Sequence, residues 1–216
     1  MNNQLQSIVL DWIPDQSRVI DFGCGDGTLL KILAEKKSVK GYGVEIDGEK
    51  INSCIANGVS VIQQDIDAGI QNYIGMGFDI AIMASSIQCL RSPRNAMRNI
   101  LQVANECVIT LPNFGNWELR LGLLKGKMPS SAQLPAKWYE TKNLHLCTIS
   151  DFEDLCAEES FRIKKKVYLN SRGKSSWLAN TFPNLFAAEA VYLLSLIHIS
   201  EPTRPRLISY AVFCLK

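Results

Sequence analysis

The sequence has 216 residues, of which 47% are hydrophobic and 20% are charged, so we expect a globular protein with a sizeable core. The formal net charge is only +2, which gives no electrostatic case for nucleic acid or an anionic membrane as a partner. The start of the chain lacks the pattern of a signal peptide, and no stretch approaches the roughly 20 apolar residues of a membrane span. The seven cysteines form no C-x-x-C pair, which favours reduced thiols and a cytoplasmic protein.

Strands and helices alternate along the first half of the sequence. Periodicity predicts strands at 18–21, 42–46, 59–63, 78–84 and 106–111, with helices at 28–37, 49–57 and 93–104. The fourth strand is continuous and apolar, as buried parallel strands usually are. This order predicts an α/β fold with a doubly wound, mostly parallel sheet.

The second half of the sequence is less regular. Residues 113–146 contain two tryptophans and two prolines, and we interpret them as an inserted helical or loop cover over one edge of the sheet. A helix is predicted over 148–159, with Thr148 or Ser150 as its N-cap. A sixth strand is predicted over 161–169.

The last segment, 195–216, differs in character from the rest. Its stretch SLIHISEPTRP closely resembles the translation of a sequencing-library adapter. We therefore expect residues 1–194 to form a single domain, and we treat 195–216 as a non-native tail whose His198 and Cys214 enter no functional argument. The alternative is a genuine terminal strand over LISYAVFCL.

The strongest functional pattern is the glycine loop DFGCGDG, which joins the first predicted strand to the first helix. Gly23, Gly25 and Gly27 allow positive φ and a close approach of a ligand to the backbone. Their G-x-G-x-G spacing differs from the dinucleotide fingerprint G-x-G-x-x-G. The charges of Asp21 and Asp26 oppose a pyrophosphate and suit a cationic sulfonium that carries an amino group, so the loop favours S-adenosylmethionine (SAM). The alternative is a tight strand–helix turn without a ligand.

Polar residues also follow the next three predicted strands. Glu45 closes the second strand, where a carboxylate can accept hydrogen bonds from both ribose hydroxyls. Asp65 follows the third strand and can reach an adenine amino group, with Asp67 and the backbone of Ile66 as alternatives. Ser85 follows the fourth strand, where we expect the methionyl part and the reaction centre. Either acid could instead be a solvated loop carboxylate, but this ordered set is more specific than any one member.

Candidates for catalysis are few. His145 precedes a predicted helix and is the one catalytic candidate, as a residue that would line the acceptor side. The alternative is a structural histidine bonded to a loop. Cys147 has no visible activator, and no cluster of metal ligands is evident, so we expect no bound metal. The segment 84–87 reads ASSI where amide-methylating enzymes carry an Asn/Asp-Pro-Pro-Tyr/Phe loop, which disfavours that activity.

The segment 113–146 is rich in aromatic residues, with Phe114, Trp117, Trp138 and Tyr139 spread along it. One interpretation is a lid that packs on the sheet. The other is a partner-binding surface, because aromatic residues are enriched in the cores of interfaces. The sequence leaves both open.

Several stretches resemble known families. DFGCGDG, GYGVEID and VIQQDID resemble the SAM-binding motifs of class I methyltransferases. More narrowly, ITLPNFGNW, KGKMP and LPAKWYETKNLHLCT resemble the bacterial methionine biosynthesis protein MetW family, from about residue 10 to residue 194.

The resemblance implies a class I SAM methyltransferase-like (Rossmann-like) fold and SAM or S-adenosylhomocysteine as the ligand. It also implies a role in methionine biosynthesis beside homoserine O-acyltransferase, whose activity the protein would support. Two hypotheses follow: a SAM-sensing partner subunit of that enzyme, or a methyltransferase that acts on a small molecule. The resemblance and the missing acceptor motif favour the first, since fold alone does not establish catalysis.

Overall fold

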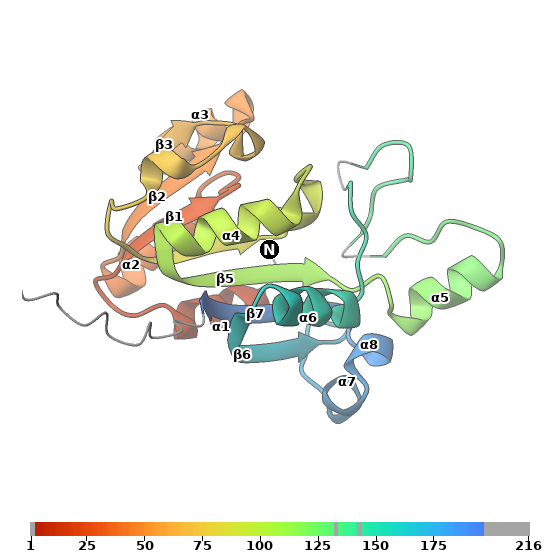
Figure 1. Cartoon of the computed structure of the whole chain (residues 1–216). Helices are drawn as coiled ribbons and strands as arrows, with labels where there is room; N and C mark the ends of the chain where they lie inside the picture. The colour runs from red at the N-terminus through yellow and green to blue at the C-terminus, as the bar shows by residue number, and fades with distance from the viewer. Residues whose placement is uncertain (1–2, 132–133, 142–143, 197–216) are drawn as a thin grey trace, which may run out of the picture.

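The computed structural model describes residues 3–131, 134–141 and 144–196, which build one central sheet (Figure 1). The strand order is β3-β2-β1-β4-β5-β7-β6. The strands are β1 (Arg18–Phe22), β2 (Lys40–Glu45), β3 (Ser60–Gln63), β4 (Phe78–Ala84), β5 (Ala104–Pro112), β6 (Phe161–Leu169) and β7 (Glu189–Leu196). The first five pair in parallel, and β7 runs antiparallel between β5 and β6. The predicted α/β fold with a mostly parallel sheet is therefore confirmed.

Helices cover both faces of this sheet. They are α1 (Asn3–Trp12), α2 (Thr28–Lys37), α3 (Gly48–Ala56), α4 (Pro93–Val103), α5 (Trp117–Leu124), α6 (Ile149–Glu158), α7 (Trp177–Thr181) and α8 (Pro183–Phe186). Apolar side chains of α4 and α6 pack with one face of the strands, and those of α1, α2 and α3 pack with the other. Successive strand residues alternate between these two cores: Val19 enters one, and Ile20 enters the other. The helices therefore leave the carboxyl ends of the strands free to form a site.

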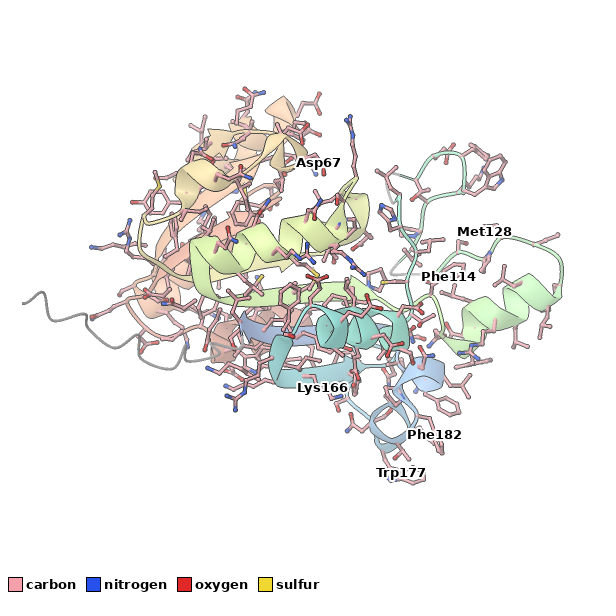
Figure 2. The ribbon with its side chains drawn as sticks, in the orientation of Figure 1. Asp67, Phe114, Met128, Lys166, Trp177 and Phe182 are labelled. Carbon is pink, nitrogen blue, oxygen red and sulfur yellow. The ribbon has the colours of Figure 1, made fainter. Side chains whose placement is uncertain are left out.

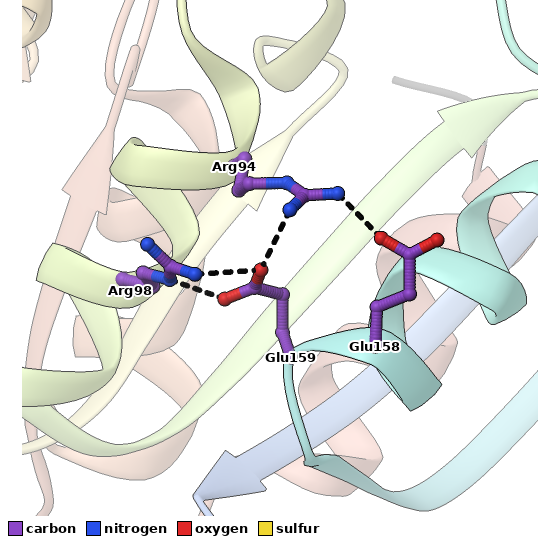
Figure 3. Close-up of polar contacts among 4 residues, drawn as sticks. All are labelled: Arg94, Arg98, Glu158 and Glu159. Atoms are coloured by element: carbon purple, nitrogen blue, oxygen red, sulfur yellow. Dashed lines mark hydrogen bonds and ion pairs between the residues drawn. The ribbon is translucent and has the colours of Figure 1, made fainter.

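Salt bridges join α4 to the end of α6 on one face of the sheet (Figure 3). Arg98 holds the carboxylate of Glu159 through two nitrogens, and Arg94 contacts both Glu158 and Glu159. The side chain of Glu159 is only 4% exposed, whereas both arginines are about half exposed. Exposed ion pairs contribute little to the free energy of unfolding. The contribution of these salt bridges therefore comes mainly from the pairs that involve the buried Glu159.

The residue patterns predicted most elements, but not all. Thr148 proves to be the N-cap of α6, where its hydroxyl accepts from the Asp151 backbone N–H in a capping box. No helix or strand with bounds was predicted at α1, α5, α7, α8 or β7, although α5 lies within the cover expected over 113–146. In the predicted tail, β7 continues through Ser195, opposite Glu106, and Leu196, opposite Phe161. The remainder of that tail, including the alternative strand over 207–215, lies outside the described residues.

Candidate functional site

The carboxyl ends of the parallel strands open into a cleft of about 700 Å³. Seven of the eight residues predicted to bind a cofactor line it: Asp21, Gly23, Gly25, Glu45, Asp65, Ile66 and Ser85. The exception is Gly27, which lies behind the loop at the N-cap of α2. The structure thus brings together residues from four separate strand ends, as expected for a ligand site at the edge of an open α/β sheet.

The three loop glycines all have positive φ but differ in what surrounds them. A Cβ on Gly23 would lie 2.9 Å from the Cβ of Ser86, and one on Gly27 would lie 3.0 Å from the sulfur of Cys54. A Cβ on Gly25 would meet no atom within 4 Å, although this residue lines the cleft. Gly23 and Gly27 therefore allow close packing of the chain, while Gly25 keeps the cleft open beside the backbone.

Glu45 braces the glycine loop against the end of β2. Its carboxylate is 6% exposed and accepts from the backbone N–H of Gly25 at 2.9 Å, Ile46 at 2.9 Å and Asp47 at 3.1 Å. A carboxylate offers about four acceptor positions, so about one remains for a ligand hydroxyl. The predicted ligand role of Glu45 stays a prediction, and its bond to the glycine loop was not predicted.

Asp21 is a buried acid at the inner end of the cleft. Its side chain is 2% exposed in all, and its Oδ1 has no hydrogen-bond partner among the described residues. Burial, and then the nearby charge of Glu45, raise the pKa of Asp21 to about 7. A buried carboxylate without a partner is costly when ionised, so a cation brought into the cleft would stabilise it.

The predicted adenine side contains two aspartates with different surroundings. Asp65 uses one carboxylate oxygen to accept from the Asp67 backbone N–H at 2.9 Å, where it caps the short helix Ile66–Ala68. Asp67, near the top of Figure 2, accepts from the Arg91 backbone N–H through both of its oxygens, at 3.0 and 3.1 Å. Asp65 keeps an oxygen available to a ligand, and Asp67 instead fixes the segment that carries Arg91.

Ser85 lies at the predicted reaction edge with a left-handed backbone, at φ 56°. This conformation is uncommon for a residue other than glycine and often marks a functional constraint. The Ser85 N–H donates to the Thr110 hydroxyl at 2.9 Å, and Ser86 donates from its hydroxyl to the Phe22 carbonyl at 2.9 Å. Thr110 is fully buried on β5, so the body of the sheet holds this turn in place.

His145 does not line the cleft, although its neighbour Leu144 does. It is exposed, with Nε2 3.4 Å from the Arg91 carbonyl, and its backbone N–H donates to the Gln88 carbonyl at 3.0 Å. The pKa of Cys147 is raised to about 11 by burial and by Asp151, which opposes its use as a nucleophile. Among the residues that the structure describes, no group of three or more potential ligands could hold a metal ion.

Further residues that were not predicted complete the lining of the cleft. Gln6 reaches the cleft from α1, Lys50 from α3 and Arg91 from the loop before α4. A signal for α1 was present, because Leu5, Val9 and Trp12 recur at helical spacing in a segment considered only as a leader. No local pattern could have placed Arg91, since its position depends on contacts with the distant Asp67.

Charges in the cleft are unbalanced. Two cationic residues, Lys50 and Arg91, line it together with six carboxylates, which are Asp21, Asp26, Glu45, Asp47, Asp65 and Asp67. Such a lining favours a cationic ligand over a pyrophosphate.

Solved structures with this architecture include SAM-dependent methyltransferases. One is a TehB-like SAM-dependent methyltransferase from Corynebacterium glutamicum, 12% identical, covering 89% of this chain and 87% of that one, with a TM-score of 0.58. Another is a SAM-dependent methyltransferase from Thermotoga maritima, 14% identical, covering 89% and 88%, with a TM-score of 0.60. The chain therefore has a class I SAM methyltransferase-like fold.

Within that class, the family model described as methionine biosynthesis protein MetW matches residues 4–194. The chain belongs to the MetW family, which confirms the resemblance noted in the sequence. A relative in Rhodopirellula baltica, the bifunctional methionine biosynthesis protein MetXA/MetW, is 28% identical over 193 residues. The match covers 85% of this chain but only 31% of that relative. Among the described residues, none of the helices has the length and apolarity needed to span a membrane.

Proposed function

We propose that this methionine biosynthesis protein binds SAM in the acidic cleft and supports the activity of homoserine O-acyltransferase as its partner subunit. The observation that carries the ligand assignment is the buried Asp21, whose Oδ1 has no hydrogen-bond partner among the described residues, beside a glycine loop that is open at Gly25. The observation that carries the partner is the fused relative, whose name joins MetXA to MetW.

SAM fits the cleft in size and charge. A volume of about 700 Å³ falls within the usual range for small-molecule sites. In this proposal the ammonium and sulfonium lie near Asp21, the ribose uses the remaining acceptor position of Glu45, and the adenine amino group reaches Asp65 or the Ile66 backbone. S-adenosylhomocysteine would make the same contacts apart from those of the sulfonium.

The partner assignment rests on the relative of which this chain matches 31%. Fusion holds two units at a high effective concentration, which is useful when they act together. SAM would then report the end product of the pathway to the acyltransferase. Such coupling is reciprocal. If bound SAM changes the affinity of this protein for the acyltransferase by some factor, the bound acyltransferase should change its affinity for SAM by the same factor.

The alternative function is methyl transfer to a small molecule. The left-handed backbone of Ser85 at the reaction edge favours it, because such strain clusters at active sites. In this case, holding the acceptor beside the methyl group of SAM would account for much of the acceleration of methyl transfer. His145 lies outside the lining of the cleft, so this alternative names no base.

The proposed function is tested by calorimetry and by an activity assay with the acyltransferase of the same organism. We expect binding of SAM or S-adenosylhomocysteine without comparable binding of NAD, and a higher acyltransferase rate in the presence of this chain. Tighter binding of NAD would contradict the ligand assignment. An unchanged acyltransferase rate, with transfer of labelled methyl groups into a metabolite extract, would replace the partner hypothesis with the enzyme hypothesis.

The pKa of Asp21 predicts a pH dependence for SAM binding. With a pKa raised to about 7, the carboxyl is mostly protonated below that pH, and only the ionised form attracts a cation. About one tenth of the Asp21 carboxyl is ionised at pH 6 and about nine tenths at pH 8, so SAM affinity should rise about tenfold between these pH values. Calorimetry in buffers of different ionisation enthalpy should detect proton release on binding near neutral pH. Asp21→Asn should flatten the profile, and an equally steep profile in that variant would exclude Asp21 as the cause.

A further inference from the structure

Large apolar side chains are exposed unevenly over the molecule. Among the described residues, nine such side chains lie within 117–146 and three within 177–182, against five elsewhere. Large apolar patches on soluble proteins commonly mark interaction sites. Trp117, Trp138 and Tyr139 of the predicted cover are exposed, whereas Phe114 is half-buried, so most aromatic side chains of the cover do not pack on the sheet.

Helix α5 is apolar on two opposite faces. Leu119 points into the protein and is 3% exposed. Trp117, Leu121 and Leu124 follow i, i+4, i+7 spacing on the opposite side and are 41%, 44% and 82% exposed. Glu118 and Arg120 lie between these two apolar sides. The outer side of α5 is therefore an apolar stripe that the described part of the chain does not cover.

Helices α7 and α8 expose a second group of apolar side chains at the same end of the molecule. Trp177, Leu178 and Phe182 are 74%, 44% and 56% exposed, and Figure 2 shows Trp177 and Phe182 directed outward. Figure 1 shows α5 beyond the end of β5, and α7 and α8 near the end of β6, all three away from α3. We call these three side chains, together with Trp117, Leu121 and Leu124 of α5, the α5–α8 surface.

Two buried asparagines hold the parts of this surface in a fixed relation. The side-chain amides of Asn113 and Asn116 both donate to the Ala187 carbonyl, at 2.7 and 3.1 Å. Between them, a Cβ on Gly115 would lie 2.8 Å from Asn184 Oδ1, so the start of α5 packs closely against α8. These contacts use the LPNFGNW stretch, which had no assigned role in the cleft, and they preorganise the surface for a partner.

Four exposed cationic residues flank the α5–α8 surface, and α5 also carries one exposed acid, Glu118. Lys125 and Lys127 follow α5, while Arg172 and Lys174 precede α7, and all four are exposed. None of the ion pairs recorded among the described residues involves them. A partner that matches this surface has an apolar centre and an acidic rim, since complementary charges steer association and fix orientation.

We propose that the α5–α8 surface is the docking site for the homoserine O-acyltransferase unit, which meets it with an apolar patch rimmed by acidic side chains. The inference rests on the proposed function, because the fused MetXA/MetW relative is what identifies the occupant. None of the six side chains of this surface lines the cleft, so the docking site and the ligand site use different residues.

The test is the dissociation constant of the full chain with the acyltransferase of the same organism, measured by calorimetry or sedimentation. Leu124→Glu and Trp177→Ala alter side chains that are 82% and 74% exposed, so both variants should fold and bind SAM as the wild type does. Ile55→Glu is the matched control, because Ile55 is 64% exposed on α3, away from the α5–α8 surface. We expect each surface variant to weaken binding at least about tenfold, as loss of an interface anchor does, and the control to bind unchanged.

The outcomes separate the docking site from the function. If the wild type binds and both surface variants bind equally well, the docking site is wrong although the partnership stands. If the wild type does not bind, the proposed partnership fails and the inference fails with it. Added salt should also weaken the wild-type complex, and Lys125→Glu with Lys127→Glu should slow association; salt-independent binding would overturn the acidic rim.

Discussion

Replacing Gly25 by asparagine should lower SAM affinity by more than a hundredfold, a loss of about 3 kcal/mol. A Cβ at this position would meet no protein atom within 4 Å and would project into the cleft, so the new side chain occupies space that the ligand needs. Asparagine tolerates the left-handed backbone at φ 61° better than most residues, so the fold should survive. Calorimetry with SAM provides the measurement.

Gly58→Asn is the matched control for that experiment. Gly58 also has positive φ, at 74°, and a Cβ there would likewise meet no atom within 4 Å, but it does not line the cleft. The two variants should therefore share any cost of backbone strain, while only Gly25→Asn loses the ligand. Wild-type affinity in Gly25→Asn would show that SAM does not approach the glycine loop.

Replacing Glu45 by alanine should weaken SAM by about 1.5–3 kcal/mol, the usual range for a hydrogen bond to a charged group. The substitution removes the acceptor for the ribose and also releases the Gly25 N–H. Glu49→Ala removes a neighbouring carboxylate that does not line the cleft, and it should leave SAM affinity unchanged.

A 2′-deoxyribose analogue of SAM separates the two roles of Glu45. If the carboxylate binds the ribose hydroxyl, the analogue should bind the wild type and Glu45→Ala with more similar affinities than SAM does. This comparison is a double-mutant cycle between the protein and the ligand. If Glu45→Ala weakens binding of the analogue as much as it weakens binding of SAM, Glu45 acts through the loop alone. Unchanged SAM affinity in Glu45→Ala would refute both roles.

The sequence predicted what depends on local pattern. Apolar periodicity defines β1 to β6, and the glycines and acids at successive strand ends identify the residues of the cleft, because parallel strands bring their carboxyl ends to one edge. The capping signal at Thr148 is local too, since the hydroxyl and the backbone N–H that it accepts from lie three residues apart.

What the sequence did not reveal depends on distant contacts. The support of Ser85 by Thr110 and the bond from the Arg91 N–H to Asp67 join segments 25 and 24 residues apart. The strand β7 contains the apolar run AVYLL, a local signal that went unused, but its place between β5 and β6 is set by pairing with distant strands. The exposed face of α5 looks in sequence like part of a core, so pattern alone does not distinguish a lid from a docking surface.

The antiparallel position of β7 also sets an order for folding. Residues 189–196 fill the gap between β5 and β6, so the sheet cannot close until this late segment of the chain has been synthesised. Before then, β5 and β6 both present unpaired edges, which are prone to pair with other chains. Closing this gap joins strands whose partners lie about 80 residues apart, a long-range contact of the kind that slows folding. We therefore expect nascent chains to rely on chaperones until β7 leaves the ribosome.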